Sequence, residues 1–139
     1  MRTLKLTLKR QWFDLIKSGV KLEEYREIKY YWVRRLCWND EEMTQNDLLD
    51  AVSDMKRLTP ESKSFRNISE LLDYHNLDIA KYDQIQFTNG YSANSPRITV
   101  ECKGIHIGTG RKEWGAVEGV NYFVIELGDV LISNETETK

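Results

Sequence analysis

The sequence predicts an α+β fold, a small mixed or antiparallel β-barrel with flanking helices. Three observations lead to this class. Residues 3–8 alternate polar and apolar side chains, residues 10–18 carry an apolar stripe at helical spacing, and strand-like segments recur after residue 80. Strands separated by helices in this order favour helices packed on the outside of one sheet. With 139 residues, of which 40% are hydrophobic, the chain is predicted to form a single domain, residues 1–139.

The first part of the chain contains two predicted strands with a helix between them. The strand at residues 3–8 is followed by the helix at residues 10–18, whose aromatic and aliphatic side chains share one face. Gly19 stands where a left-handed residue would end that helix. Residues 21–28 indicate a second strand, and residues 30–36 an aromatic-rich helix or an irregular turn.

Two segments differ from the strand-rich remainder. Residues 38–80 are predicted to be a mostly helical insertion, in which Thr44 begins one helix and Asn67, with a glutamate three residues later, begins another. Leucine, valine and methionine recur at helical spacing over residues 48–55, which we attribute to helix packing rather than to ligand binding. The tail, residues 133–139, is expected to be frayed.

The last part of the chain is predicted to be strands. A strand at residues 82–87 ends in an Asn-Gly turn signal. The next covers residues 97–107, with Gly104 as a candidate bulge. A third strand at residues 122–127 is expected to be interrupted at Gly128 before the chain becomes apolar again.

Charge is unevenly distributed along a chain whose net charge is only −2. Residues 1–36 contain ten Lys or Arg and four Asp or Glu, a balance of +6, whereas residues 40–83 contain five and eleven, a balance of −6. Such asymmetry can create one positive face on a nearly neutral protein, or simply an uneven solvated surface.

Several classes of protein are disfavoured by composition. No apolar run approaches the roughly 18 residues of a membrane span, and the charged start lacks a secretory signal's apolar core. We therefore expect no membrane partner. Cys37 and Cys102 lie far apart in the sequence, which favours a reducing, cytoplasmic location over a disulfide scaffold. His75 and His106 show no paired ligand spacing with the cysteines, so no metal site is expected, and no cofactor is expected.

Residues 19–26, G-V-K-L-E-E-Y-R, have the spacing G-x-K-x-x-E-x-R. On a strand, Glu24 and Arg26 would leave by the same face because they are two residues apart. A cleft for a polar or anionic ligand would use this set, with Lys21 holding a phosphate or polarising a carbonyl across its mouth. Alternatively, Glu24 and Arg26 pair with each other or brace the strand. Tyr25 should point the opposite way, into the core.

Together with later blocks, this motif resembles the ASCH domain family, which shares the PUA-like β-barrel. The resemblance rests on W-F-D-L-I at 12–16, G-x-K-x-x-E-x-R at 19–26, Y-D-x-I-x-F-x-N-G at 82–90, W-G at 114–115 and Y-x-V-I-x-L-G at 122–128. It covers nearly the whole chain apart from the helical insertion. It implies a partly open barrel with a cleft beside the motif strand, proposed in the family to bind RNA.

The alternative hypothesis is a hydrolase, in which Lys21 would be an activated amine or an electrostatic stabiliser and Glu24 a general acid or base. Some ASCH-like proteins are amidohydrolases of N4-acylated cytidines, and others have been proposed as ribonucleases. The amidohydrolases use a threonine nucleophile three residues after the motif lysine. That position is Glu24 here, so the nucleophile is missing, and Glu101, which could stand for the family's acid, lacks its threonine partner.

The candidate ligand-binding residues come from the motif and from two later turns: Gly19, Lys21, Glu24, Arg26, Asn89, Tyr91, Arg111 and Trp114. Basic and aromatic side chains on loops bind phosphate and stack bases. The alternatives are an ordinary turn with a surface tyrosine at Asn89, which we favour there, and a structural plug at Trp114. The favoured hypothesis is a module that binds RNA or a modified nucleotide or nucleoside. The alternatives are a hydrolase of N4-acylated cytidine or RNA, and a scaffold whose acidic insertion docks proteins.

Overall fold

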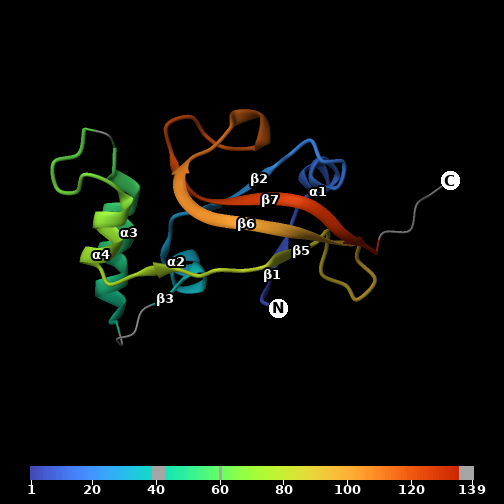
Figure 1. The fold of residues 1–139 in the computed structure, drawn as a ribbon, viewed down its shortest axis with the longest axis horizontal. Helices are drawn as coiled ribbons and strands as arrows, with labels where there is room; N and C mark the ends of the chain where they lie inside the picture. Colours follow the sequence, from blue (N-terminus) through green and yellow to red (C-terminus); the bar gives the residue numbers. More distant parts are fainter. Residues whose placement is uncertain (39–42, 60, 135–139) are drawn as a thin grey trace. The chain divides into compact units, whose positions relative to one another are not determined.

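The computed structural model describes residues 1–38, 43–59 and 61–134 (Figure 1). It has the predicted α+β class. Five strands form one sheet in the order β1-β5-β6-β7-β2, and β3 and β4 form a separate two-stranded sheet. The larger sheet is mixed, because β1 and β5 run parallel whereas β5 and β6 run antiparallel.

The chain forms two compact units. Unit 1 consists of Met1–Glu24, Lys81–Gly104 and Ile125–Lys139. Unit 2 consists of Tyr25–Ala80 and Ile105–Val124. The strands that pass from one unit into the other are β2 (Glu23–Glu27), β6 (Arg97–Thr109) and β7 (Asn121–Ser133).

The core of unit 1 forms around two parallel strands, β1 (Thr3–Thr7) and β5 (Gln84–Thr88). Their register places Leu4 opposite Ile85, and both side chains are buried. Because side chains alternate along a strand, the polar residues between them face the other side of the sheet. The alternation predicted for the first strand is therefore confirmed.

Helix α1 (Arg10–Lys17) also contributes buried side chains to unit 1. It buries Phe13 and Ile16, which lie three residues apart and so share a face. Gly19, with a φ of +80°, follows the helix end, and its N–H donates to the Ile16 carbonyl at 3.0 Å. The predicted left-handed end of this helix is confirmed.

Unit 2 contains the predicted insertion, which is mostly helical where it is described. The elements from residue 30 to residue 79 are α2 (Tyr30–Leu36), β3 (Cys37–Trp38), α3 (Gln45–Arg57), α4 (Ile68–Tyr74) and β4 (Asp78–Ile79), of which α2 precedes the predicted insertion. Figure 1 shows α3 and α4 side by side, in contact with each other. Residues 39–42 and 60 lie outside the described residues.

The starts of α3 and α4 are the predicted ones. Thr44 and Asp47 form a capping box, in which each side chain accepts from the other's backbone N–H, at 3.1 and 3.0 Å. The Asn67 side chain accepts from the Glu70 N–H at 2.9 Å. The apolar face of α3 differs from the expected stripe, because Leu49 remains 44% exposed and the buried residues are Ala51, Val52 and Met55.

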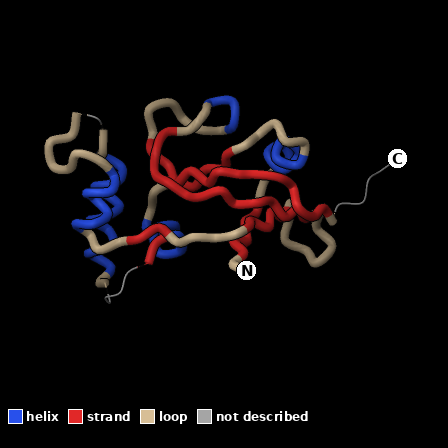
Figure 2. The backbone as a smooth tube through the Cα atoms, viewed as in Figure 1, coloured by secondary structure: helices blue, strands red, loops and turns tan. Residues whose placement is uncertain are grey.

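Strands β6 and β7 are longer than expected. The predicted interruption at Gly128 is wrong, since β7 continues through it without a break. A Cβ at Gly128 would lie 3.1 Å from the Glu101 Cβ on the neighbouring β6, so the missing side chain makes room for that neighbour. Figure 2 shows the loop that joins the two strands, and this loop contains the short 3-10 helix η1 (Lys112–Trp114).

The predicted frayed tail begins too early. Ser133 is the last residue of β7, and the next residue, Asn134, donates its N–H to the Arg97 carbonyl at 2.9 Å. Strand pairing therefore holds the chain as far as residue 134. The remainder of the expected tail, residues 135–139, lies outside the described residues.

Candidate ligand-binding site

The motif lysine and glutamate form a buried ion pair in unit 1. Lys21 Nζ lies 2.9 Å from Glu24 Oε1, and the two side chains are only 1% and 7% exposed. The turn at Gly19 brings them there, because the Lys21 N–H donates to the Leu15 carbonyl of α1 at 3.0 Å. Two charges removed from water stabilise each other, and neither can lose its partner without a large cost.

The indole of Trp12 covers the amine of this pair. Lys21 Nζ lies 4.3 Å from the Trp12 ring centroid, so a cation–π contact adds to the ion pair. We expected this amine across the mouth of a cleft, and the structure instead buries it between a carboxylate and an aromatic ring. Its participation in ligand binding or catalysis stays a prediction, as does that of Glu24.

The motif arginine belongs to unit 2 and meets helix α2. Cζ of Arg26 lies 5.1 Å from the Trp32 ring centroid, and Cζ of Arg35 lies 5.2 Å from the same ring. Trp32 and Arg35 are three residues apart and share a helix face. The Tyr31 ring stands edge-on to Trp32 at 4.8 Å, and its hydroxyl accepts from Arg35 at 3.4 Å. We call Arg26, Tyr31, Trp32 and Arg35 the α2 cluster.

Sequence reasoning chose Arg26 but missed the three other members of the α2 cluster. Residues 29–35 read K-Y-Y-W-V-R-R, in which cationic and aromatic side chains occur together. That interleaving of cationic and aromatic side chains is itself a signal for binding phosphate and bases. Tyr31 is 55% exposed and Arg34 is exposed as well, so part of this helix faces solvent.

The loop between β6 and β7 pairs the predicted Arg111 and Trp114. The Arg111 Cζ lies 4.9 Å from the Trp114 ring centroid, and its Nη1 lies 3.5 Å from Glu113 Oε1. The backbone N–H of Arg111 donates to the Tyr25 hydroxyl at 2.9 Å. Tyr25 itself is only partly buried and packs against a buried cluster that includes Tyr122, so its predicted place in the core is confirmed only in part.

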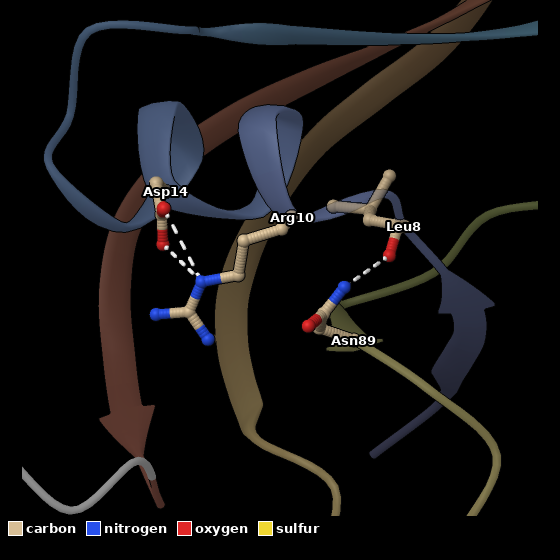
Figure 3. Close-up of polar contacts among 4 residues, drawn as sticks. All are labelled: Leu8, Arg10, Asp14 and Asn89. Atoms are coloured by element: carbon tan, nitrogen blue, oxygen red, sulfur yellow. Dashed lines mark hydrogen bonds and ion pairs between the residues drawn. The ribbon is translucent and has the colours of Figure 1, made fainter.

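The turn after β5 has a structural role. The Asn89 side-chain amide donates to the Leu8 carbonyl at 2.9 Å (Figure 3), and the Asn89 N–H donates to the Pro96 carbonyl at 3.0 Å. Asn89 therefore ties the turn to the start of α1. Tyr91 follows it and is 95% exposed, with its ring in solvent.

The candidate residues are divided between the two units. Unit 1 contains Gly19, Lys21, Glu24, Asn89 and Tyr91, and unit 2 contains Arg26, Arg111 and Trp114. The Lys21 side chain contacts Glu24, and the Arg111 side chain contacts Trp114.

The two thiols are poor nucleophiles. Burial, with the Asp78 carboxylate adding to it, raises the pKa of the Cys37 thiol to about 12. Burial also raises the pKa of Cys102. Over the described ranges, no three His, Cys, Asp or Glu side chains form a group able to hold a metal ion. No helix in the same ranges is long and apolar enough to cross a membrane.

Comparisons with family models, with curated proteins and with solved structures found no match for this chain. The ASCH resemblance and the PUA-like form of the sheet therefore stay predictions from the sequence. The geometry of the described residues carries the functional argument that follows.

Proposed function

We propose that this protein binds RNA or a nucleotide, and that the α2 cluster makes a principal contact. One observation carries the proposal: the guanidinium groups of Arg26 and Arg35 both lie within about 5 Å of the Trp32 ring. A guanidinium donates planar pairs of N–H groups to phosphate oxygens, and aromatic rings and guanidinium planes stack bases. The exposed ring of Tyr31 adds a stacking surface beside them.

Local charge supports a polyanionic ligand. Residues 26–36 contain four Lys or Arg and one acidic residue, although the whole chain has a net charge of −2. Arg34 is exposed on α2 and lies over the Tyr30 ring at 5.8 Å. A local concentration of positive charge attracts phosphates and releases their counterions, so affinity should fall as salt rises.

The proposal includes the finer fold assignment. We infer that the mixed sheet belongs to a PUA-like barrel and that the chain is an ASCH-like domain, because the motif G-x-K-x-x-E-x-R leads into β2 at one edge of that sheet. The sequence resemblance and the α+β class support this assignment.

The test is a binding titration with a fluorescein-labelled single-stranded RNA of about ten nucleotides, followed by anisotropy at about 50 and about 200 mM salt. We expect measurable binding at low salt and a loss of affinity at high salt. Arg34→Ala combined with Arg35→Ala should weaken binding at low salt and reduce the salt dependence, because two phosphate contacts are removed.

The matched control is Arg57→Ala. Arg57 is an exposed cation at the end of α3, in the acidic insertion, so its removal changes the net charge without touching the α2 cluster. It should leave the affinity nearly unchanged. Absence of binding by the wild-type protein at low salt would overturn the proposal, and an equal loss in all arginine variants would remove the α2 cluster from it.

Hydrolysis of N4-acylated cytidine or of RNA is the second candidate. It is favoured by the buried amine–carboxylate pair of Lys21 and Glu24, at 2.9 Å, because a lysine beside a carboxylate can act with it in proton transfer. Incubation with N4-acetylcytidine and with labelled RNA tests it. Turnover that disappears in Glu24→Gln, in a protein that still folds, would support hydrolysis.

A further inference from the structure

The backbone N–H and the carbonyl of Arg111 both form hydrogen bonds. Its N–H donates to the Tyr25 hydroxyl at 2.9 Å. Its carbonyl accepts from the N–H of Trp114 and from the N–H of Ala116, both at 3.1 Å. Arg111, one of the two cations of this loop with Lys112, therefore has its main chain fixed by hydrogen bonds.

Two tyrosines from neighbouring strands hold the loop at both ends. The Tyr25 hydroxyl on β2 accepts a hydrogen bond from the Arg111 N–H. The Tyr122 hydroxyl on the neighbouring β7 accepts one from the Val117 N–H at 3.0 Å. Their ring centroids are 5.7 Å apart, and both rings pack with the buried Ala116. The two hydroxyls that accept from the loop therefore belong to tyrosine rings that pack against each other in unit 2.

The loop lies directly against the Tyr25 ring. At Gly110, an added Cβ would come within 2.6 Å of two Tyr25 ring atoms and 2.8 Å of the Ala116 Cβ. Only a glycine allows this approach without displacement of the loop. The close packing and the hydrogen bond from Arg111 therefore position the same short segment.

This anchored segment presents a cation to solvent, beside an aromatic ring that is partly buried. The Arg111 side chain is 63% exposed, and its guanidinium lies over the Trp114 ring at 4.9 Å. Glu113 is an acidic neighbour, 3.5 Å from Arg111 Nη1 and 61% exposed. An anion can therefore reach the guanidinium, in competition with one carboxylate that is itself largely in water.

We propose that the loop at residues 110–117 is a preformed site for one nucleotide unit, and that Tyr25 is its positioning residue. Arg111 donates to the phosphate, and the guanidinium–indole pair stacks the base. A loop already held in its bound shape loses less conformational freedom when the ligand binds. The inference rests on the proposed function for the identity of its ligand.

The experiment is a double-mutant cycle with Tyr25→Phe and Arg111→Ala, using the labelled single-stranded RNA at low salt. Tyr25→Phe keeps the ring and removes one hydrogen bond, so we expect it to weaken RNA binding about three- to tenfold. In the Arg111→Ala background the same change should have little further effect, because Tyr25 acts through Arg111. Tyr74→Phe, which removes a hydroxyl from a tyrosine that is 71% exposed on α4, should leave affinity unchanged.

A second readout does not depend on RNA. Amide hydrogen exchange at Arg111 should be faster in Tyr25→Phe than in the wild type, and unchanged exchange would overturn the anchoring role. Gly110→Ala keeps the hydroxyl but displaces the loop from the ring. It should reproduce the loss of affinity, again only where Arg111 is present.

The two proposals fail in different ways. If the wild-type protein does not bind RNA at low salt, the proposed function fails and the nucleotide site with it. If the wild type binds, but Tyr25→Phe has no effect or has the same effect with and without Arg111, the positioning role is overturned while the proposed function stands.

Discussion

The ammonium of Lys21 and the carboxylate of Glu24 are 2.9 Å apart, with side chains that are almost completely buried. The Trp12 ring, with its centroid 4.3 Å from the Lys21 Nζ, closes over the amine. The turn after α1 and the beginning of β2 are therefore linked by a charge pair that has little contact with water. Such a pair stabilises the arrangement only while both partners are present.

Removal of one partner should be costly. Lys21→Ala removes the ammonium that lies against the buried Glu24 carboxylate, and we expect the free energy of unfolding to fall by about 3–5 kcal/mol. Urea denaturation followed by circular dichroism measures the change. A decrease of less than about 1 kcal/mol in the free energy of unfolding would contradict this prediction, because solvent-exposed ion pairs contribute that little.

The matched control for this prediction is the surface pair of Arg10 and Asp14, also in unit 1 (Figure 3). The Arg10 Nε lies 3.0 Å from Asp14 Oδ1, but the side chains are 50% and 51% exposed. Asp14→Ala should lower the free energy of unfolding by about 1 kcal/mol or less. The N–O distances of the two ion pairs are nearly equal. A larger loss of stability at the Lys21–Glu24 pair would therefore be caused by its burial.

Thr44→Ala should destabilise α3. It removes the acceptor for the Asp47 N–H and half of the capping box, which typically costs about 1 kcal/mol of protein stability. Thr44→Ser keeps a hydroxyl at the same place and should retain most of the stability. The midpoints of thermal unfolding of the two variants and the wild type are compared. Equal midpoints for Thr44→Ala and the wild type would show that the Thr44 cap does not stabilise the protein.

Cys37 should resist alkaline ionisation and thiol reagents. Its pKa is raised from an ordinary 9.0 to about 12, so at pH 8 the folded protein keeps it as the unreactive thiol. A raised pKa contributes stability that is complete below pH 9 and is lost as the pH approaches about 12. The rate of reaction with a chromogenic disulfide at pH 8 is measured for two single variants. Cys37→Ala reports the reactivity of Cys102, and Cys102→Ala reports that of Cys37. We expect Cys102 to react faster because it is less buried.

Glu113→Gln should strengthen RNA binding. Its carboxylate lies 3.5 Å from Arg111 Nη1 and competes with a phosphate for that cation. An exposed pair is worth up to about 1 kcal/mol, so a gain of about two- to fivefold in affinity is expected. Glu118→Gln removes an exposed carboxylate from the same connection and is the control for net charge. An identical gain in both variants would show that only overall charge had changed.

The sequence by itself determined the elements whose signals are local. Alternation predicted β1 and β5, the glycine after α1 predicted its end, and Thr44 and Asn67 predicted two helix starts. These predictions succeed because strand period and helix caps depend on residues within a few positions of one another. For the candidate site, the sequence pointed to Arg111 and Trp114, which lie three apart and do meet.

Only the tertiary structure decided where these side chains lie. The burial of Lys21 depends on Trp12 of the preceding helix, and the continuity of β7 through Gly128 depends on Glu101 of the adjacent strand. The hydroxyl that holds Arg111 comes from Tyr25, 86 residues away in the chain. Burial, close packing and long-range hydrogen bonds depend on which segments the fold brings together, and a pattern read along one segment contains no information about its neighbours in space.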